Sequence, residues 1–304
     1  MTEYQHQPVL LKEALEYLQV KPGRIYLDAT LGDGGHTQAI LEKGASVIAI
    51  DQDPQALERA SARLQSACPD INIKLDVMLP VTQVEAKTCL LIRSNFANLD
   101  QLINLPIDGI LFDLGVSTLQ ILMPQRGFTF QSEGPLDMRM DPDLGVTAAD
   151  LLMALSQKEL TRLLLELGDE TFAAKIARRI VKVRQRTPIV TTTQLADLVA
   201  RIKPHSKIHP ATKTFQALRM AVNQERYSLT QALPQALRLL KKQGRLVIIS
   251  FHSGEDRLVK HFLKEQAESN NLEILTSKPV KPTVLEINQN HKARSAKLRA
   301  AAKQ

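Results

Sequence analysis

Acidic residues and glycines alternate in a short stretch near the start of this 304-residue sequence. It reads Asp28-Ala-Thr-Leu-Gly32-Asp-Gly34-Gly35-His36, after a short apolar run and before a helical pattern. Glycines at such a point permit a sharp turn and let the backbone come close to a ligand. Asp51 ends the next apolar run, where an acid binds ribose hydroxyl groups. The turn and the acid together predict a site for a nucleotide-like cofactor.

The details of the turn favour S-adenosylmethionine over a dinucleotide. A dinucleotide site carries G-x-G-x-x-G, whereas Thr37 stands where the third glycine is needed after Gly32 and Gly34. S-adenosylmethionine has no pyrophosphate, and Asp28 on the first strand suits its charged amino-acid end. Asp33 and Asp53 have an open alternative, which is a role in turns or helix caps.

Short apolar runs alternate with helical patterns, and this alternation positions the turn and the acid. Strands are predicted at 24–28, 46–51, 88–92, 107–113 and 245–251. Helices are predicted at 8–18, 36–43 and 54–66, and a further helix opens at Ser253, where Ser-x-x-Asp resembles a cap. The order favours an α/β fold with a doubly wound, mostly parallel sheet. Residues 68–87 have only a weak pattern.

The alternation stops after Asp113, and residues 147–205 show helical periodicity alone. We therefore predict a discontinuous core at 1–140 and 206–304 with an all-helical insertion at 141–205. The formal net charge is +7, and residues 172–220 carry eleven lysines and arginines against one acid, Asp197. Such an excess favours a nucleic-acid partner. The insertion is the predicted RNA-recognition domain, with phosphate contacts expected from Arg178, Arg179, Lys182 and Arg184.

Composition excludes several other classes of protein. Hydrophobic residues make up 44% of the chain, which suits a packed core, and no apolar run reaches the length of about 18 residues that spans a bilayer. The N-terminus lacks a signal-peptide pattern, so a cytoplasmic protein without membrane contact is expected. Cys68 and Cys89 are the only cysteines and are interpreted as small apolar residues. No metal is expected.

Strings along nearly the whole chain resemble one family closely. They are HQPVLLKEAL, DATLGDGGHT, AIDQDPQAL, SNFANL, DGILFDLGVS, RGFTF, GPLDMRMDP, FAAKIARRIV, HPATKTFQALRMAVNQE, GRLVIISFHSGEDRLVK and ARSAKLR, in this order. The sequence is similar to the bacterial small-subunit rRNA cytidine N4-methyltransferases, the RsmH (MraW) family. The resemblance implies a class I S-adenosylmethionine-dependent methyltransferase core with a helical insertion.

The resemblance also implies a reaction and a set of contacts. The reaction is methylation of the exocyclic N4 of a cytidine in the decoding region of small-subunit (16S) rRNA, in naked rRNA or the assembled subunit. The cofactor contacts that it implies are Gly34, Gly35, His36, Asp51, Phe96, Asp113 and Gln120. Asp28 and Gly32 join them from the spacing argument above.

Asp113 and Ser117 are the candidate catalytic residues. Asp113 ends a predicted strand, and ligands of open α/β sheets bind at the carboxyl ends of strands. We expect Asp113 to orient the cytosine amine or accept its proton, or else to bind cofactor only. Ser117 is a weaker candidate for a hydrogen bond to the base. Asp137 and Arg139 are expected to form an ion pair, and His209 and His252 to orient loops or contact phosphate.

Three other interpretations stay open at this stage. A nicotinamide-dependent oxidoreductase would share the sheet and Asp51, and a titration of S-adenosylmethionine against NAD separates it. A non-catalytic RNA-binding or assembly factor would keep the basic insertion but transfer no methyl group. A DNA or protein amine is a conceivable substrate, because composition alone does not select rRNA.

Overall fold

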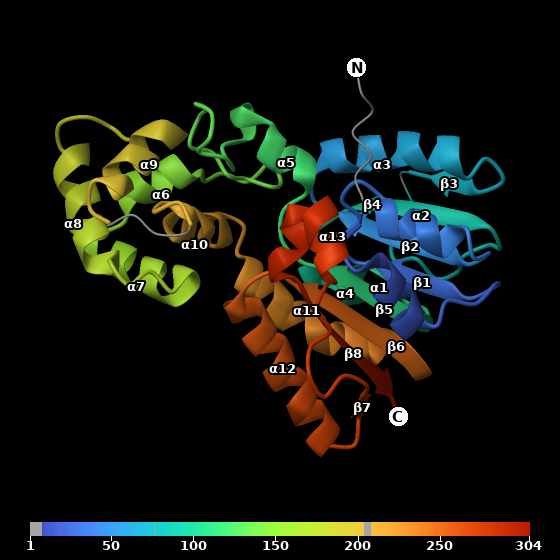
Figure 1. Cartoon of the computed structure of the whole chain (residues 1–304). Helices are drawn as coiled ribbons and strands as arrows, with labels where there is room; N and C mark the ends of the chain where they lie inside the picture. Colours follow the sequence, from blue (N-terminus) through green and yellow to red (C-terminus); the bar gives the residue numbers. More distant parts are fainter. Residues whose placement is uncertain (1–7, 76, 204–207) are drawn as a thin grey trace. The chain divides into compact units, whose positions relative to one another are not determined.

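The computed structural model describes residues 8–75, 77–203 and 208–304 (Figure 1). The chain forms two compact units, a core unit (Met1–Gly115 with Tyr227–Gln304) and a helical unit (Val116–Arg226). The helical unit is therefore longer at both ends than the predicted insertion at 141–205. His6 and Gln7 of the first family string, the predicted boundary at 206 and Lys207 of the basic stretch lie outside the described residues.

The core unit is built on one eight-stranded sheet with the order β3-β4-β2-β1-β5-β6-β8-β7. Its strands are β1 (Ile25–Asp28), β2 (Ser46–Asp51), β3 (Asn72–Lys74), β4 (Thr88–Arg93), β5 (Ile107–Asp113), β6 (Leu240–Ser250), β7 (Leu272–Ile274) and β8 (Lys297–Lys303). Its helices are α1 (Leu11–Leu18), α2 (Gly35–Leu41), α3 (Pro54–Ala67), α4 (Leu99–Leu102), α11 (Glu225–Leu239), α12 (Ser253–Glu268) and α13 (Val284–Gln289), with short 3-10 turns η1 (Phe96–Asn98) and η3 (His291–Ser295).

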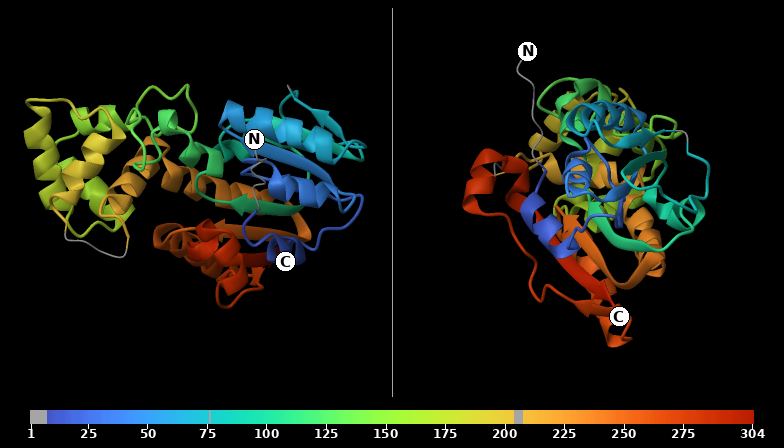
Figure 2. Two further views of the ribbon diagram at one scale, coloured as in Figure 1. Left: turned by 45° about the horizontal axis from the view of Figure 1, so that its top comes forward. Right: turned by 90° about the vertical axis from the view of Figure 1, so that its right-hand side faces the viewer.

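The six strands from β3 to β6 are parallel, and β8 runs antiparallel between β6 and β7. The C-terminal strands, red in Figure 2, form one edge of the sheet. The strand order reverses at β1, because β2 pairs on one side of it and β5 on the other. This is the class I methyltransferase arrangement, so the predicted fold class is confirmed. Ligands of such sheets bind at the carboxyl ends of the strands beside this reversal.

The central strands are apolar on both faces because helices cover both. Ile48 and Ile50 of β2 join one buried cluster with residues of α4, α11 and α12. Val47 and Ala49 join the other cluster with residues of α1, α2 and α3. Successive side chains point to opposite faces of a strand, so continuous apolar runs such as SVIAID are required here.

The predicted elements agree with the structure to within a few residues, apart from the two ends of the sheet. The strands at 46–51 and 107–113 are confirmed at the same bounds, and the first helix begins at Leu11 instead of Pro8. The weak segment 68–87 contains the short edge strand β3, and neither β7 nor β8 was predicted. Cys68 and Cys89 are both buried and free, as expected. No helix within the described ranges has the length and apolar character to cross a bilayer.

The helical unit contains α5 (Thr118–Leu122), α6 (Ala148–Ala154), α7 (Gln157–Gly168), α8 (Ala173–Arg184), α9 (Thr192–Ala200) and α10 (Thr212–Val222), with the 3-10 turn η2 (Pro124–Arg126). Buried residues of α8 recur at the helical spacing of Ala173, Ile176, Ala177 and Ile180. They pack into a separate apolar cluster with residues of α6, α7, α9 and α10. The helical character predicted for 147–205 is confirmed over its described part, where α6 to α9 lie.

Side-chain caps and one internal ion pair define the loops of this unit. Capping boxes begin α5, α6, α7 and α9. Arg139 Nε lies 2.8 Å from Asp137 Oδ1, and its guanidinium also donates to the carbonyls of Pro142 and Leu144. The predicted ion pair is therefore confirmed, and it holds the GPLDMRMDP loop closed on itself.

Replacing Lys203 by Met is expected to destabilise the protein by about 3–5 kcal/mol, because it removes the partner of a buried charge. The Glu170 side chain is 0% exposed, and Lys203 Nζ lies 2.7 Å from its Oε2. Urea unfolding of the K203M variant measures the loss. K158M is the matched control, since Lys158 is exposed on α7, and it is expected to change stability by at most about 0.5 kcal/mol. Equal unfolding midpoints for K203M and the wild type would contradict the assignment.

Candidate active site

The predicted site residues of the core unit meet at the carboxyl ends of β1, β2, β4 and β5. The register pairs Asp28 with Ala49 and Leu111, and Asp51 with Arg93. Backbone hydrogen bonds join the turns beyond these strands, from Leu31 N–H to the Ile50 carbonyl and from Ser94 N–H to the Asp51 carbonyl. Residues far apart in the sequence therefore line one edge of the sheet.

The glycine turn after β1 adopts the left-handed backbone that was expected of it. Gly32 has φ +51° and Gly34 has φ +77°, a region that side chains disfavour. A Cβ on Gly35 would lie 2.4 Å from Pro8 Cγ, so this glycine is needed for packing against the N-terminal segment. A Cβ on Gly32 would meet only the Thr30 carbonyl, at 3.9 Å. The turn thus leaves open space at Gly32, where a ligand can approach.

Asp51 ties the turn to the second strand. Its Oδ2 accepts the Gly32 N–H at 2.8 Å, and its Oδ1 accepts the Asp53 N–H at 2.9 Å. Burial raises the pKa of Asp51 to about 6, although the two N–H donors lower it. A carboxylate in this state holds the turn in place and keeps lone pairs for hydroxyl donors of a ligand.

Asp28 lies beneath the turn and is fixed by two threonines. It is 1% exposed, and it accepts the Thr37 hydroxyl at 2.7 Å and the Thr30 N–H at 3.1 Å. Burial raises the pKa of the Asp28 carboxyl. Asp28 therefore supports the turn from within, and its direct contact with a cofactor stays a prediction.

Asp113 ends β5 with one carboxylate oxygen unsatisfied. Its Oδ1 is buried and has no hydrogen-bond partner among the described residues. Its Oδ2 lies 3.7 Å from His36 Nδ1, and its backbone N–H donates to the Thr30 hydroxyl at 2.6 Å. Burial raises the pKa of Asp113 well above its usual range, and the charges of Asp28 and Glu255 raise it further.

His36 is a buried connector in this structure. It is 6% exposed, and its Nε2 lies 3.1 Å from the Val9 carbonyl, to which it donates. Its other ring nitrogen faces Asp113. The histidine thus links the N-terminal segment to the Asp113 carboxylate, while its cofactor contact stays a prediction.

Phe96 lies directly after β4, at the start of η1. Its ring packs edge-on against Phe112, with centroids 5.7 Å apart and an interplanar angle of 86°. The side chain is only half-buried. Phe96 therefore presents an apolar surface at the edge where the other site residues gather.

The two aspartates with open alternatives differ in their roles. Asp53 caps α3, because its side chain accepts the Gln55 N–H at 3.1 Å. Asp33 pairs with Arg59 Nε at 3.1 Å, and its second oxygen has no hydrogen-bond partner in the described part of the chain. Burial lowers the pKa of the Lys292 amine, which lies in η3, to about 8, and the negative charge of Asp33 opposes this shift.

Several predicted residues belong to the helical unit, and their contacts with cofactor or RNA stay predictions. Ser117 and Gln120 form the capping box of α5, in which each side chain bonds the other's backbone N–H. Arg178, Arg179 and Lys182 are exposed on α8. The Arg184 guanidinium is turned inward instead, where it donates to the carbonyls of Leu152 and Leu155.

The histidines and the cap of α12 show where local signals were misleading. His209 stacks on Phe130 with centroids 4.4 Å apart, and its Nδ1 accepts the Ala211 N–H, so it orients a loop as expected. His252, not Ser253, is the N-cap of α12, because its Nδ1 accepts the Glu255 N–H at 3.3 Å. The expected Ser-x-x-Asp cap is therefore wrong, and Asp256 pairs with Arg299 and Lys297.

Three contributors to the site escaped sequence reasoning. Thr30 and Thr37 hold Asp113 and Asp28, and Glu255 acts on Asp113 through its charge. The two threonines lie in the DATLGDGGHT motif, two and nine residues after Asp28, so this motif could have indicated their role. Nothing in the local sequence placed Glu255 beside Asp113, since they are 142 residues apart.

The geometry fits the methyl donor that the sequence predicts. Open space at Gly32 and the unpartnered Oδ1 of Asp113 are features that a bound polar ligand would use. The carboxylates of Asp28, Asp51 and Asp113 suit a positively charged ligand and would repel a pyrophosphate. Within the described ranges, no group of three His, Cys, Asp or Glu side chains is arranged to hold a metal ion.

Comparison with known proteins finds similar sequences over nearly the whole chain. Ribosomal RNA small subunit methyltransferase H of Caldicellulosiruptor saccharolyticus is 43% identical over 99% of both chains. The protein of the same name from Thermomicrobium roseum is 46% identical over 97% of this chain and 93% of its own. An rRNA methylase structure from Streptococcus thermophilus aligns over 96% of this chain and 93% of its own, at 15% identity and a TM-score of 0.44.

The family profile of the MraW methylases covers more of the sequence than any single motif does. It matches residues 3–304, which include both units and every string on which the resemblance was based. The chain therefore belongs to the MraW methylase family.

Proposed function

We propose that this protein transfers a methyl group from S-adenosylmethionine to the exocyclic N4 of a cytidine in the decoding region of small-subunit (16S) rRNA. Its relatives named ribosomal RNA small subunit methyltransferase H, at 41–46% identity over nearly their full length, support rRNA of the small subunit as the substrate. The choice of N4 rests on the family resemblance and on the chemistry of Asp113.

The core site is suited to a cationic methyl donor. When bound, S-adenosylmethionine supplies a sulfonium methyl group as the electrophile. Asp51 would accept hydrogen bonds from the ribose hydroxyls of the cofactor. The backbone of the Gly32 turn would approach the cofactor closely, and Phe96 would contact its adenine. Asp28, Asp51 and Asp113 lie at one edge of the sheet, and in their ionised form these carboxylates would stabilise a sulfonium charge.

The observation that carries the proposal is the buried Oδ1 of Asp113, which has no hydrogen-bond partner in the described part of the chain. A cytosine amine is a poor nucleophile, since its lone pair is delocalised into the ring. An acceptor at Asp113 Oδ1 would orient the amine and take its proton as positive charge develops on nitrogen. Burial raises the pKa of the Asp113 carboxyl, which makes the ionised carboxylate a stronger proton acceptor.

His36 would act as a positioning residue for this acceptor. Its Nε2 is held by the Val9 carbonyl, and its Nδ1 faces Asp113 Oδ2 at 3.7 Å. This arrangement would fix the orientation of the Asp113 carboxylate. Ser117 remains a candidate for a hydrogen bond to the base, and Gln120 for a cofactor contact.

The target base would leave its stack to reach the core site, and flanking phosphates would then be held by cations. Arg178, Arg179 and Lys182 are exposed along α8 and are our candidates for that contact. Arg184 is engaged with the Leu152 and Leu155 carbonyls, so it is left out of the proposed surface.

Replacing Arg178, Arg179 and Lys182 by Ala is expected to flatten the salt dependence of RNA binding. Each phosphate contact with single-stranded RNA contributes about 0.7 to the slope of log K against log salt, so three contacts contribute about 2. Filter binding at several salt concentrations measures the slope. K158A on the neighbouring helix α7 is the control, and an unchanged slope in the triple variant would remove α8 from the interface.

The decisive experiment supplies labelled S-adenosylmethionine with naked 16S rRNA and, separately, with assembled small subunits. Digestion and mass spectrometry of the nucleosides are expected to show N4-methylcytidine at one decoding-region position. Methylation at another atom or nucleotide would overturn the specificity. Label transfer only to DNA or protein, or no transfer, would overturn the proposed substrate.

A further inference from the structure

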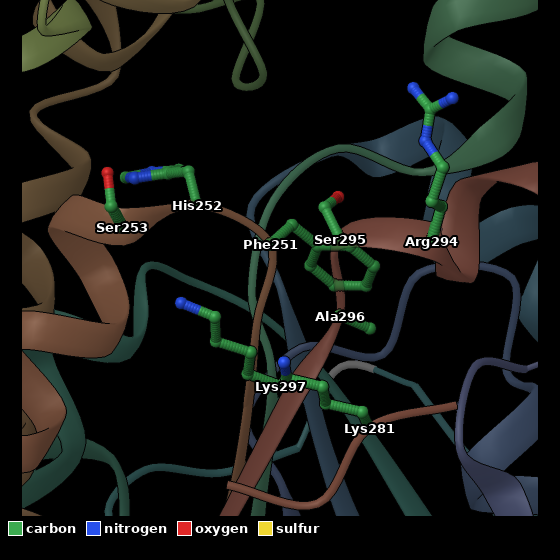
Figure 3. Close-up of a pocket in the computed structure, with 8 residues that line it drawn as sticks. All are labelled: Phe251, His252, Ser253, Lys281, Arg294, Ser295, Ala296 and Lys297. Atoms are coloured by element: carbon green, nitrogen blue, oxygen red, sulfur yellow. The ribbon is translucent and has the colours of Figure 1, made fainter. Parts of the chain in front are cut away.

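A basic pocket lies in the core unit, apart from the residues predicted to bind the cofactor. It is lined by Phe251, His252, Ser253, Lys281, Arg294, Ser295, Ala296 and Lys297, and its volume is about 250 Å3 (Figure 3). A single water needs about 15 Å3 of such space, so the pocket has room for a larger polar group. No acidic side chain lines it.

The fold places like charges together in this pocket. Val280 and Leu298 form an antiparallel bridge with two backbone hydrogen bonds, which sets the next residues, Lys281 and Lys297, opposite each other. Figure 3 shows both lysines below the ring of Phe251 in this view and Ser295 above it, while Arg294 lies to the right with its guanidinium extending upward. Like charges facing across strands are unfavourable unless an anion lies between them.

Internal ion pairs neutralise only part of this charge. Lys297 Nζ lies 3.2 Å from Asp256 Oδ2, and Asp256 also binds Arg299 at 2.7 Å. Lys281 and Arg294 are exposed, and their side chains have no ion pair or hydrogen bond among the described residues. Two full positive charges therefore remain available to a ligand.

The other donors of the pocket suit the same kind of ligand. Ser295 contributes a hydroxyl group, and Ser253 lies at the beginning of α12, where His252 is the N-cap. Lysine, arginine and hydroxyl groups are donors that bind phosphate oxygens. A sulfonium compound, being cationic, would be repelled here.

The pocket also lies close to the proposed reacting atoms. Asp113 is in register with Ile249 on β6, and Phe251 follows two residues later. Gly115, just beyond Asp113, approaches the same ring, since a Cβ on Gly115 would lie 3.7 Å from Phe251 Cδ2. A phosphate held in the pocket would therefore sit beside the segment that carries Asp113.

We propose that Lys281, Arg294 and Lys297 bind a phosphodiester of the RNA substrate that flanks the target nucleotide. The inference rests on the proposed function, because it takes RNA as the substrate. It adds a phosphate site on the core unit, separate from α8. Such a site would fix the strand at the catalytic edge without reading its sequence.

The test reverses the two unpaired charges in a K281E/R294E variant. The KM for small-subunit RNA is expected to rise at least about tenfold, and the salt slope of RNA binding to fall by about 1.4, from two contacts. The kcat at saturating RNA and the Kd for S-adenosylmethionine are expected to stay within about twofold of the wild type. K281Q/R294Q is a milder variant, which serves if charge reversal impairs folding.

The matched control is K43E/K242E, with the same change in net charge. Lys43 and Lys242 are exposed near the starts of β2 and β6, at the opposite end of these strands. An effect of net charge alone would raise the KM equally in both variants and would overturn the site. An unchanged KM in K281E/R294E would overturn it as well.

Two further arms separate other outcomes. Inorganic phosphate titrated into the wild type tests the pocket as a site for free phosphate, and tight phosphate binding with an unchanged RNA KM in the variant would overturn the RNA assignment. A wild-type protein that transfers no methyl group to RNA would overturn the proposed function, and this inference with it. Normal methylation by the wild type with an unaffected variant would overturn this inference alone.

Discussion

The D113N variant is expected to lose methyl transfer by a factor of about 10²–10⁴ in kcat, the range that general acid–base catalysis contributes. An amide has nearly the same size as the carboxylate but cannot take a proton from the cytosine amine. The Kd for S-adenosylmethionine is expected to change less than about tenfold, because the other predicted cofactor contacts, such as Asp51 and Phe96, are unchanged in this variant. Single-turnover methylation with saturating RNA measures the rate, and calorimetry measures the Kd.

The control for this prediction is E255Q, which removes the Glu255 charge beside Asp113 and leaves Asp113 itself in place. The Glu255 carboxylate raises the pKa of Asp113, so its loss lowers that pKa. In the proposed mechanism the ionised form of Asp113 is the proton acceptor, so the rate is expected to fall as pH falls through the pKa of Asp113. The acidic limb of the pH–rate profile is therefore expected to move to lower pH in E255Q. Near-normal turnover in D113N would restrict Asp113 to cofactor binding.

The fold was predictable wherever the sequence period matched the burial. SVIAID has the unbroken apolar character of a strand buried on both faces. The glycine turn indicated the end of β1 and the beginning of α2. Strand β8 was missed because its sequence, KLRAAAK, combines alanines with basic residues. Alanine is a poor strand former, so local propensity opposed the observed pairing.

Tertiary contacts explain why this segment forms a strand. Leu298 and Ala300 to Ala302 are almost fully buried between β6 and β7, and Arg299 is buried against Asp256. Lys303 donates to the carbonyls of Arg238 and Leu240. The basic C-terminus therefore contributes much of its charge to internal bonds, which no count of lysines and arginines can reveal.

The site was predictable to the extent that its residues stand at strand ends. Asp28, Asp51 and Asp113 were found in this way, and the structure brings all three to one edge. Spacing could not assign the partners of these carboxylates. Asp28 accepts hydrogen bonds from Thr30 and Thr37, Asp51 accepts them from the Gly32 and Asp53 N–H groups, and Asp113 faces His36. Ser117 and Gln120 came from a motif, and the capping box gives them a local structural role besides the predicted ones.

The D51N variant is expected to weaken S-adenosylmethionine binding by at least about 100-fold. Two hydrogen bonds from ribose hydroxyls to a charged acceptor contribute about 1.5–3 kcal/mol each, and an amide replaces half of the acceptor with a donor. Isothermal titration calorimetry measures the Kd of both proteins. An unchanged Kd in D51N would mean that the cofactor does not contact this carboxylate.

The pH dependence of S-adenosylmethionine binding tests the protonation state of Asp51. The pKa of Asp51 in the folded protein is about 6, raised from 3.8 mainly by burial. The ionised carboxylate accepts the hydroxyls, so wild-type affinity is expected to fall as pH falls below about 6, by up to tenfold per pH unit. Binding near pH 6 should release protons, which calorimetry in buffers of different ionisation enthalpy detects. In D51N, position 51 has no titrating carboxyl, so it should contribute neither to the loss of affinity below about pH 6 nor to proton release on binding.

Thermal unfolding without cofactor separates lost binding from lost folding. An acid whose pKa is higher in the folded than in the unfolded protein makes folding less favourable as pH rises from the lower value to the higher one, by about 1.4 kcal/mol per pH unit between them. D51N avoids this cost but loses one acceptor for the Gly32 and Asp53 N–H groups. Its midpoint relative to that of the wild type is therefore expected to be higher at pH 7 than at pH 4, where the wild-type carboxyl is largely protonated in the folded state. A variant that binds no cofactor but follows this pattern has lost a binding group, whereas one that unfolds at every pH has lost the turn.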